Sequence, residues 1–167
     1  MDKSDSDEGQ KTLPGHIFQI NLSMDGVPKR AVRSADVTNL GLVGDSPRHL
    51  DIHGGPDRAV CLYSLERILA LQTEGHPIFP GSIGENLTLV GLDWGCIAPE
   101  IKLRLGADVL LQITKYTNPC NTITESFIEG DVEKVSETRN PGWSRVYARV
   151  LQTGTIRVGD PVKIEQV

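Results

Sequence analysis

The chain has 167 residues, which is enough for one well-buried domain and hardly enough for two. Its formal net charge of −5 at pH 7 argues against a nucleic-acid surface as its main function, so no nucleic-acid partner is expected. No apolar run approaches the roughly 20 residues needed to cross a bilayer, and the acidic start of the chain lacks the pattern of a secretory signal. We therefore expect a cytoplasmic protein without a membrane partner.

The composition favours many short strands over a helical bundle. Aromatic residues make up only 5% of the chain, while it contains 17 glycines and 10 prolines, the residues that punctuate turns. Three cysteines form an odd set without a Cys-x-x-Cys pair. That pattern argues against both a disulfide framework and a structural zinc site built from cysteines.

The first half of the chain is predicted to hold a tail, several strands and one helix. Residues 1–14 are polar and without periodicity, which predicts a disordered acidic tail, and residues 15–167 form a single domain. A helix begins after Ser64, whose side chain can cap it, and ends before Gly75 and Pro77. Strands are predicted at 15–22, 31–40 and 60–63, the last of which makes Cys61 a buried packing residue.

The second half alternates apolar and polar residues over short stretches, as β-strands do. Strands are predicted at 87–92, 101–105, 109–115, 143–151, 155–158 and 162–164, with short helices at 123–127 and 132–139. Sequential strands joined by tight glycine turns favour a mainly β fold, an antiparallel barrel with a few short helices. No Gly-x-Gly-x-x-Gly or Walker-type loop is present, which disfavours the nucleotide-binding folds.

Cys120 is the residue best placed for chemistry. The strand 109–115 leads to Pro119, which has no N–H for a sheet ladder and therefore stops the strand just before the cysteine. A rigid strand that delivers one thiol to a polar loop is a common way to present sulfur for reaction. The alternative is that Cys120 is a small turn residue with no chemical role.

A second dense stretch surrounds His53. His49, Asp51 and His53 alternate, so on a strand they would share one face and could bind zinc or iron; on a loop they would not converge. The Gly54-Gly55 pair lets the backbone approach a ligand, or simply makes a turn. Cys120 and His53 could also form a nucleophile and base pair, a question of distance that the sequence leaves open.

Two further segments carry polar groups for which the sequence allows two roles. The glycine-framed segment 81–86 contains Glu85 and Asn86, which could line a pocket or hold the scaffold. The basic cluster of Lys29, Arg30 and Arg33 is either solvated surface or an anion site.

Taken together, these motifs resemble a MOSC domain, the module named after the C-terminal part of molybdenum-cofactor sulfurase. The matching segments occur in the family's order over nearly the whole chain: 41–45 (GLVGD), 53–59 (HGGPDRA), 80–86 (PGSIGEN), 119–120 (PC), and 148–150 (ARV) before Gly154 and 158–160 (VGD). The resemblance implies a closed, mostly antiparallel β-barrel. It also implies that Cys120 bears the reactive sulfur, either as a molybdenum ligand or as a persulfide.

The resemblance further implies a function and a site. Stand-alone bacterial members resemble amidoxime-reducing proteins, which use molybdenum cofactor (molybdopterin) to reduce N-hydroxylated small molecules; pyridoxal phosphate is not expected to bind this domain alone. Electrons would come from a separate donor protein, because the chain has no ferredoxin cysteine set. By the same analogy, the cofactor would be surrounded by His53, Gly54, Asn86, Thr117 and Asn118, with Lys29 or Arg48 on its phosphate.

The chain departs from the family in one place. Many relatives have an arginine two residues before the Pro-Cys pair, where this chain has Thr117 followed by Asn118, so that cationic contact is missing or supplied elsewhere. Three hypotheses follow. The first is a molybdenum-cofactor enzyme, the second is a sulfur-carrier module with a persulfide on Cys120 and no turnover of its own, and the third is a zinc protein built on His49, Asp51 and His53.

Overall fold

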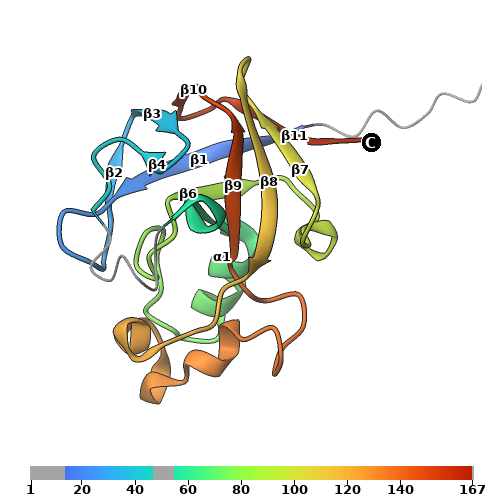
Figure 1. Cartoon of the computed structure of the whole chain (residues 1–167). Coiled ribbons are helices and arrows are strands. Elements are labelled where there is room, and N and C mark those ends of the chain that lie inside the picture. Colours follow the sequence, from blue (N-terminus) through green and yellow to red (C-terminus); the bar gives the residue numbers. More distant parts are fainter. Residues whose placement is uncertain (1–13, 47–54, 167) are drawn as a thin grey trace, which may run out of the picture.

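A computed structural model describes residues 14–46 and 55–166 of the chain. Within these residues it contains eleven strands, one α-helix and five 3₁₀ turns (Figure 1). In chain order they are β1 (Gly15–Leu22), β2 (Arg30–Val32), β3 (Ser34–Thr38), β4 (Gly41–Leu42), η1 (Pro56–Arg58), β5 (Val60–Ser64), α1 (Leu65–Thr73), β6 (Leu87–Val90), η2 (Trp94–Cys96), β7 (Lys102–Leu105), β8 (Val109–Tyr116), η3 (Asn121–Ser126), η4 (Ile128–Gly130), η5 (Val132–Val135), β9 (Val146–Gln152), β10 (Gly154–Arg157) and β11 (Pro161–Glu165).

Seven strands close into a barrel, which confirms the predicted fold class. Their order is β11-β7-β8-β9-β5-β6-β1, and pairing of β1 with β11 closes the ring, while β2 pairs with the C-terminal end of β1. The pairs are antiparallel except β5 with β6, which run parallel in the register Leu62↔Leu87. The parallel pair needs a crossover, and α1 lies in the connection between the two strands.

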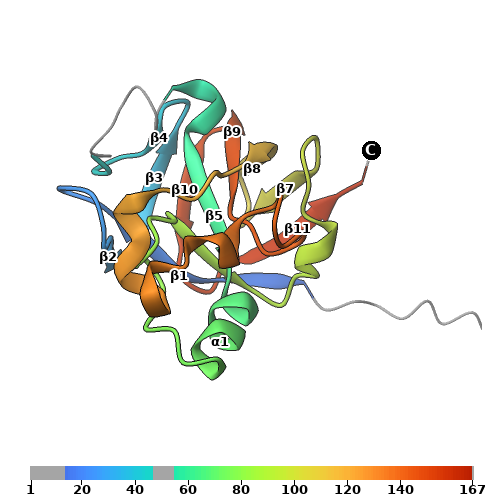
Figure 2. The ribbon, with the colours of Figure 1, turned by 90° about the horizontal axis from the view of Figure 1, so that it is seen from below.

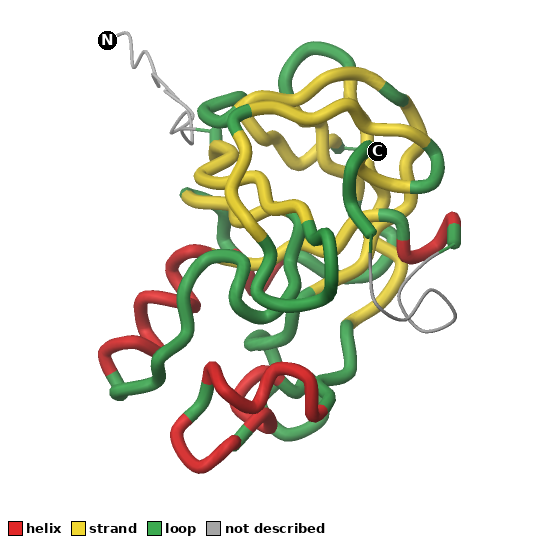
Figure 3. The backbone as a smooth tube through the Cα atoms, turned by 90° about the vertical axis from the view of Figure 1, so that its left-hand side faces the viewer, coloured by secondary structure: helices red, strands yellow, loops and turns green. Residues whose placement is uncertain are grey.

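A smaller sheet and a set of helical turns flank the barrel. Strands β10, β3 and β4 form the three-stranded sheet. Helix α1 and the turns η3 to η5 gather at one end of the barrel, the end that faces the viewer in Figure 2 and that carries the red segments at the lower left of Figure 3. The barrel interior is filled by fully buried aliphatic side chains from opposite strands, including Ile17, Leu103, Leu105, Leu111, Ile113, Val146 and Val162.

The predicted elements are largely confirmed. The helix begins as expected, because the Ser64 hydroxyl accepts a hydrogen bond from the Arg67 N–H at 3.2 Å. The stretch 31–40, predicted as one strand region, divides into β2 and β3. The segments 123–127 and 132–139, predicted as helices, form only 3₁₀ turns, since neither has enough apolar residues at helical spacing to hold a longer helix.

A register shift in β1 changes which side chains face the core. Strict alternation predicts that Ile17 and Ile20 point to opposite faces. The pairing with β6 shifts between Ile17 and Gln19, and both isoleucines are fully buried while Phe18 is exposed. An extra residue in one strand of an antiparallel pair reverses the alternation beyond it, which explains the outcome.

No helix among the described residues is long and apolar enough to cross a membrane.

The connection of β4 to the barrel depends on a glycine. Gly41 has a φ of +122°, and a Cβ built on it would collide with the carbonyl oxygen of Ala59. We predict that Gly41→Ala lowers the free energy of unfolding by several kcal/mol, roughly 1–2 from the backbone conformation and a further 1–3 from the collision. Urea unfolding measures this loss.

Gly159 provides the matched control. Its φ of +91° is also positive, but nothing lies within 4 Å of the position where a Cβ would stand. Gly159→Ala should therefore show only the backbone cost of roughly 1–2 kcal/mol. Equal losses in the two variants would mean that the close approach of Gly41 to Ala59 contributes nothing.

Candidate functional site

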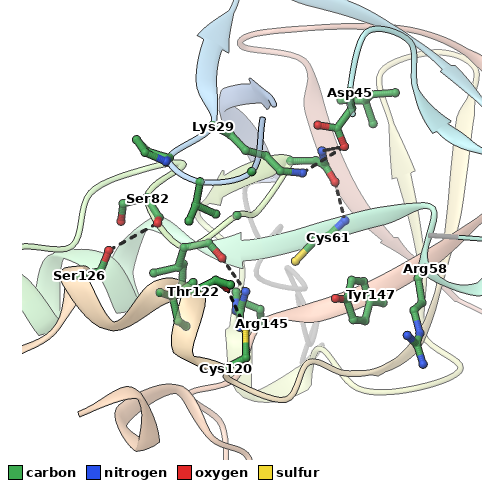
Figure 4. A pocket seen from close by; sticks show the side chains of 18 of the residues that line it. Lys29, Asp45, Arg58, Cys61, Ser82, Cys120, Thr122, Ser126, Arg145 and Tyr147 are labelled. Carbon is green, nitrogen blue, oxygen red and sulfur yellow. Dashed lines mark hydrogen bonds and ion pairs between the residues drawn. The ribbon is translucent and has the colours of Figure 1, made fainter. Parts of the chain in front are cut away.

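One cavity of about 720 Å³ brings together most of the chemically interesting side chains of the described residues. Its volume lies within the range of roughly 300–1,000 Å³ that is common for small-molecule sites. Loop 26–29, strand β4, loop 79–86 and turn η3 surround it, with β5 and β9 behind them (Figure 4). Its chemically active lining consists of two thiols, three cations, two carboxylates and a phenol: Cys61, Cys120, Lys29, Arg58, Arg145, Asp45, Glu125 and Tyr147.

Cys120 follows the end of a strand, as the sequence predicted, and it lines this cavity. Strand β8 ends at Tyr116, after which the Thr117 N–H still donates to the Arg145 carbonyl at 3.0 Å. Pro119 then turns the chain, and Cys120 precedes the first residue of η3. Its thiol is partly exposed and lies 2.8 Å from the Thr122 hydroxyl (Figure 4). The thiol is thus accessible from the cavity and is held by one polar contact.

Cys61 places a second thiol in the same cavity. The prediction that it is buried is confirmed, since only 5% of the residue is exposed. Burial raises the pKa of this thiol, although the nearby charges of Arg145 and Lys29 oppose the shift. Cys61 is therefore a neutral thiol at physiological pH. Sequence reasoning missed its place in the lining, because a short apolar strand gives no sign that one face borders a cavity.

Asn86 and Lys29, both predicted to bind the cofactor, line the cavity and are also tied into its wall. The Asn86 side chain accepts from the Cys61 N–H at 2.9 Å and donates to Asp45 at 2.9 Å. Lys29 forms an ion pair with Asp45 at 3.1 Å, and both side chains are nearly buried. The same carboxylate accepts from the Ser23 N–H. Asp45 therefore neutralises Lys29 and fixes three segments of the wall.

Arg145 and Tyr147 are functional candidates that the sequence analysis did not single out. Both fall in the stretch 143–151, which the sequence predicted only as an alternating strand, and only 4% of Arg145 and 6% of Tyr147 is exposed. One face of β9 packs into the barrel and the other forms the cavity wall. Burial raises the pKa of Tyr147, and the cationic groups of Arg58 and Lys115 lie 6.0 and 5.8 Å from its ring centre.

Glu85 holds the loop that forms one wall. Its carboxyl group is fully buried, accepts from the Gly81 N–H at 3.0 Å and from the Thr88 hydroxyl at 3.2 Å, and so closes the loop 81–85. Burial raises its pKa to about 7, against the lowering effects of these hydrogen bonds and of the Arg145 charge. The segment 81–86 serves both roles left open by the sequence: Ser82, Ile83, Gly84 and Asn86 line the cavity, and Glu85 supports them.

The remaining predicted site residues lie elsewhere. Thr117 is buried with its hydroxyl beside the Cys61 thiol, and Asn118 is exposed; neither lines the cavity. His53, Gly54 and Arg48 lie outside the described residues, as do His49 and Asp51 of the zinc hypothesis. Residues 14–46 and 55–166 contain no group of three or more His, Cys, Asp or Glu side chains that could hold a metal ion by themselves.

Comparison with known proteins identifies the class of protein to which this barrel and its cavity belong. The family model of the MOSC domain matches residues 49–163, and the chain belongs to this family. Its fold is also that of a solved structure, YiiM from Geobacillus stearothermophilus, with a TM-score of 0.69 and 24% sequence identity over 92% of this chain and 76% of that one.

Two curated relatives cover most of this chain. YflK of Bacillus subtilis is 31% identical over 138 residues, which are 80% of this chain and 60% of YflK. A protein named reductase from Gibberella moniliformis is 29% identical over 129 residues, which are 74% of this chain but 22% of the reductase. The chain thus spans about three fifths of YflK and about a fifth of the reductase.

The buried Glu85 predicts a pH-dependent stability. Because its pKa in the fold is about 7 and its ordinary value is 4.5, the folded protein keeps a proton that the unfolded chain has released between these values. The contribution of Glu85 to the free energy of unfolding should therefore be largest below about pH 4.5. It should fall by about 3 kcal/mol as the pH rises through 7. Urea unfolding between pH 5 and 8 measures the slope.

Glu85→Gln is the matched control for this slope. Glutamine keeps an oxygen that can accept from the Gly81 N–H but cannot ionise, so the difference in stability between the two proteins should shift in favour of the variant as pH rises. A difference that stays constant from pH 5 to 8 would show that Glu85 does not titrate in this range.

Proposed function

We propose that this protein binds molybdenum cofactor in the 720 Å³ cavity and reduces N-hydroxylated small molecules, with Cys120 as the ligand of molybdenum. The observation that carries the proposal is the position of the Cys120 thiol: partly exposed, at a strand end, in a cavity with a cationic wall, in a chain of the MOSC family.

The residues present fit such a cofactor. A thiolate is a soft ligand of the kind that such metals accept, and the metal favours loss of its proton. A single protein thiol is enough when an organic cofactor supplies the other ligands of the metal. Arg58 and Arg145 give the wall cations for an anionic cofactor, beside Lys29, whose charge is paired with Asp45, and the Nε atom of Arg145 is buried without a hydrogen-bond partner.

The reaction converts an N–OH group to N–H, with two electrons and two protons consumed and one water released. When bound, the cofactor supplies the two-electron chemistry at the N–O bond, and a separate protein supplies the electrons. The chain's own groups bind and position the cofactor and the substrate, and the two protons come from solvent. Tyr147 keeps its proton because burial raises its pKa, so its hydroxyl is a hydrogen-bond donor at neutral pH. Asn86, Asp45 and Glu85 hold the wall rigid.

The similarity to known proteins supports a reductive activity and says nothing of the substrate. The Gibberella protein carries the name reductase, and the part of it that matches this chain is about a fifth of its length. A reductive reaction by this chain is therefore our inference from the family and the cavity together.

The first test removes the thiol. We expect wild-type protein, made in cells that produce molybdenum cofactor, to contain molybdenum and pterin and to reduce an N-hydroxylated amidine with a reduced viologen dye. Cys120→Ala should lose the metal and at least about 100-fold in activity, because loss of a ligand costs no less than loss of its outer partners. Its melting temperature should change little, since the thiol is partly exposed.

Two other cysteines serve as controls. Cys96→Ala removes an exposed thiol outside the cavity and should leave metal content and activity unchanged. Cys61→Ala removes a buried thiol and should affect stability more than activity. Full activity in Cys120→Ala would contradict the proposal. Cyanide-labile sulfur on Cys120 in protein without molybdenum would instead support the sulfur-carrier hypothesis.

A further inference from the structure

Arg145 is a buried cation without a counter-ion among the described residues. It is 4% exposed, and none of the ion pairs of the described residues includes it. Its Nη1 donates to the Ile83 carbonyl oxygen, while its Nε atom is buried with no hydrogen-bond partner. The residue lines the cavity and lies at the same end of it as Cys120 (Figure 4).

Such an arrangement is costly for the protein alone. A guanidinium has five N–H donors and stays charged at any physiological pH, so its burial must be balanced by hydrogen bonds and negative charge. The buried carboxyl group of Glu85 does interact electrostatically with Arg145. Glu85 is occupied by the Gly81 N–H and the Thr88 hydroxyl, and its raised pKa leaves it only partly ionised near neutrality.

The other charges of the cavity are arranged differently. Lys29 is neutralised by Asp45, which also accepts from Asn86 and from the backbone of residue 23. Arg58 lies over the Tyr147 ring at 6.0 Å. Glu125 is an exposed residue of the lining and has no ion pair with Arg145. Among the cations of the described cavity wall, Arg145 is therefore the one whose charge is available to a ligand.

We propose that Arg145 is an oxyanion-binding subsite of the cavity, which receives the phosphate of a phosphate monoester or the carboxylate of a substrate. The planar guanidinium offers paired N–H donors that match the oxygens of either group. The subsite deepens the proposed function and rests on it for the identity of the ligand. Its own existence is tested without metal or turnover.

Inorganic phosphate is the probe, added to the full chain made in cells that lack molybdenum cofactor. We expect phosphate to raise the melting temperature of the wild type more than chloride does at equal ionic strength. We also expect phosphate to shift the Nε–H resonance of Arg145 in a ¹⁵N NMR spectrum. Arg145→Gln should bind phosphate at least about tenfold more weakly, the effect of losing one hydrogen bond to a charged group.

Arg149→Gln is the matched control. Arg149 lies in β9, just beyond Arg145, and its Nε is likewise buried without a hydrogen-bond partner, but it pairs with Asp57 at 3.2 Å and does not line the cavity, so its variant should bind phosphate like the wild type. Equal phosphate affinity in Arg145→Gln and the wild type would overturn the subsite. If Arg145→Gln does not fold, the spectrum of the wild type is the test. An Nε–H resonance of Arg145 that does not shift when phosphate is added would also overturn the subsite.

A second measurement distinguishes the two sources of the anion. If Arg145 holds a cofactor phosphate, Arg145→Gln from cofactor-producing cells should lose pterin. If it holds a substrate carboxylate, the variant should keep pterin but show a raised KM only for N-hydroxylated substrates that carry a carboxylate. Either outcome supports the subsite, and a variant that matches the wild type in both respects contradicts it. A wild type without molybdenum that still binds phosphate through Arg145 would contradict the proposed function alone.

Discussion

A buried network of side-chain hydrogen bonds around the segment 81–86 is the constraint on which the cavity depends. Asn21, Glu85 and Thr88 are fully buried, and all three are connected: the Asn21 amide donates to the Glu85 carbonyl and to Thr88, which donates to the Glu85 carboxyl group. Polar groups at such depth are tolerated only when they are paired, so the loop has one low-energy arrangement. The network links β1 to β6, and Asn86 of the same segment links it to β5 through the Cys61 N–H.

The two thiols of the cavity differ in their surroundings. Asn86 accepts from the backbone of Cys61 and holds that thiol in the wall, where burial keeps it protonated. Cys120 lies beyond a proline, on a polar loop, with a hydroxyl as its neighbour. A thiol buried in the wall is less accessible to a bound metal than a thiol at the edge of the cavity, and its raised pKa also disfavours the thiolate form that binds a metal. Position in the fold, rather than residue type, therefore selects one sulfur for chemistry.

Local patterns were enough to predict the barrel, the capped helix and the placement of Cys120. Alternation gives strands, Ser64 gives the helix start, and Pro119 gives the end of β8, since each depends on neighbours in sequence. The register shift in β1 and the roles of Cys61, Arg145 and Tyr147 were not predictable in this way. They depend on which face of a strand borders a cavity, and this follows from pairing between segments far apart in the chain. Asn86 and Lys29 were predicted for the site, and the structure adds that they are hydrogen-bonded into its wall.

The distribution of charge links this architecture to function. A lysine neutralised by an aspartate stabilises the wall but offers little to a ligand, whereas a buried guanidinium with an unpaired Nε lowers stability until an anion arrives. Proteins retain such an unfavourable group where a ligand compensates it, because the cost is then recovered in binding. Arg145 lies just before β9, and its carbonyl accepts a hydrogen bond from the Thr117 N–H in the segment that leads to Cys120. Binding of an anion by Arg145 and placement of the Cys120 thiol therefore involve the same short stretch of sheet.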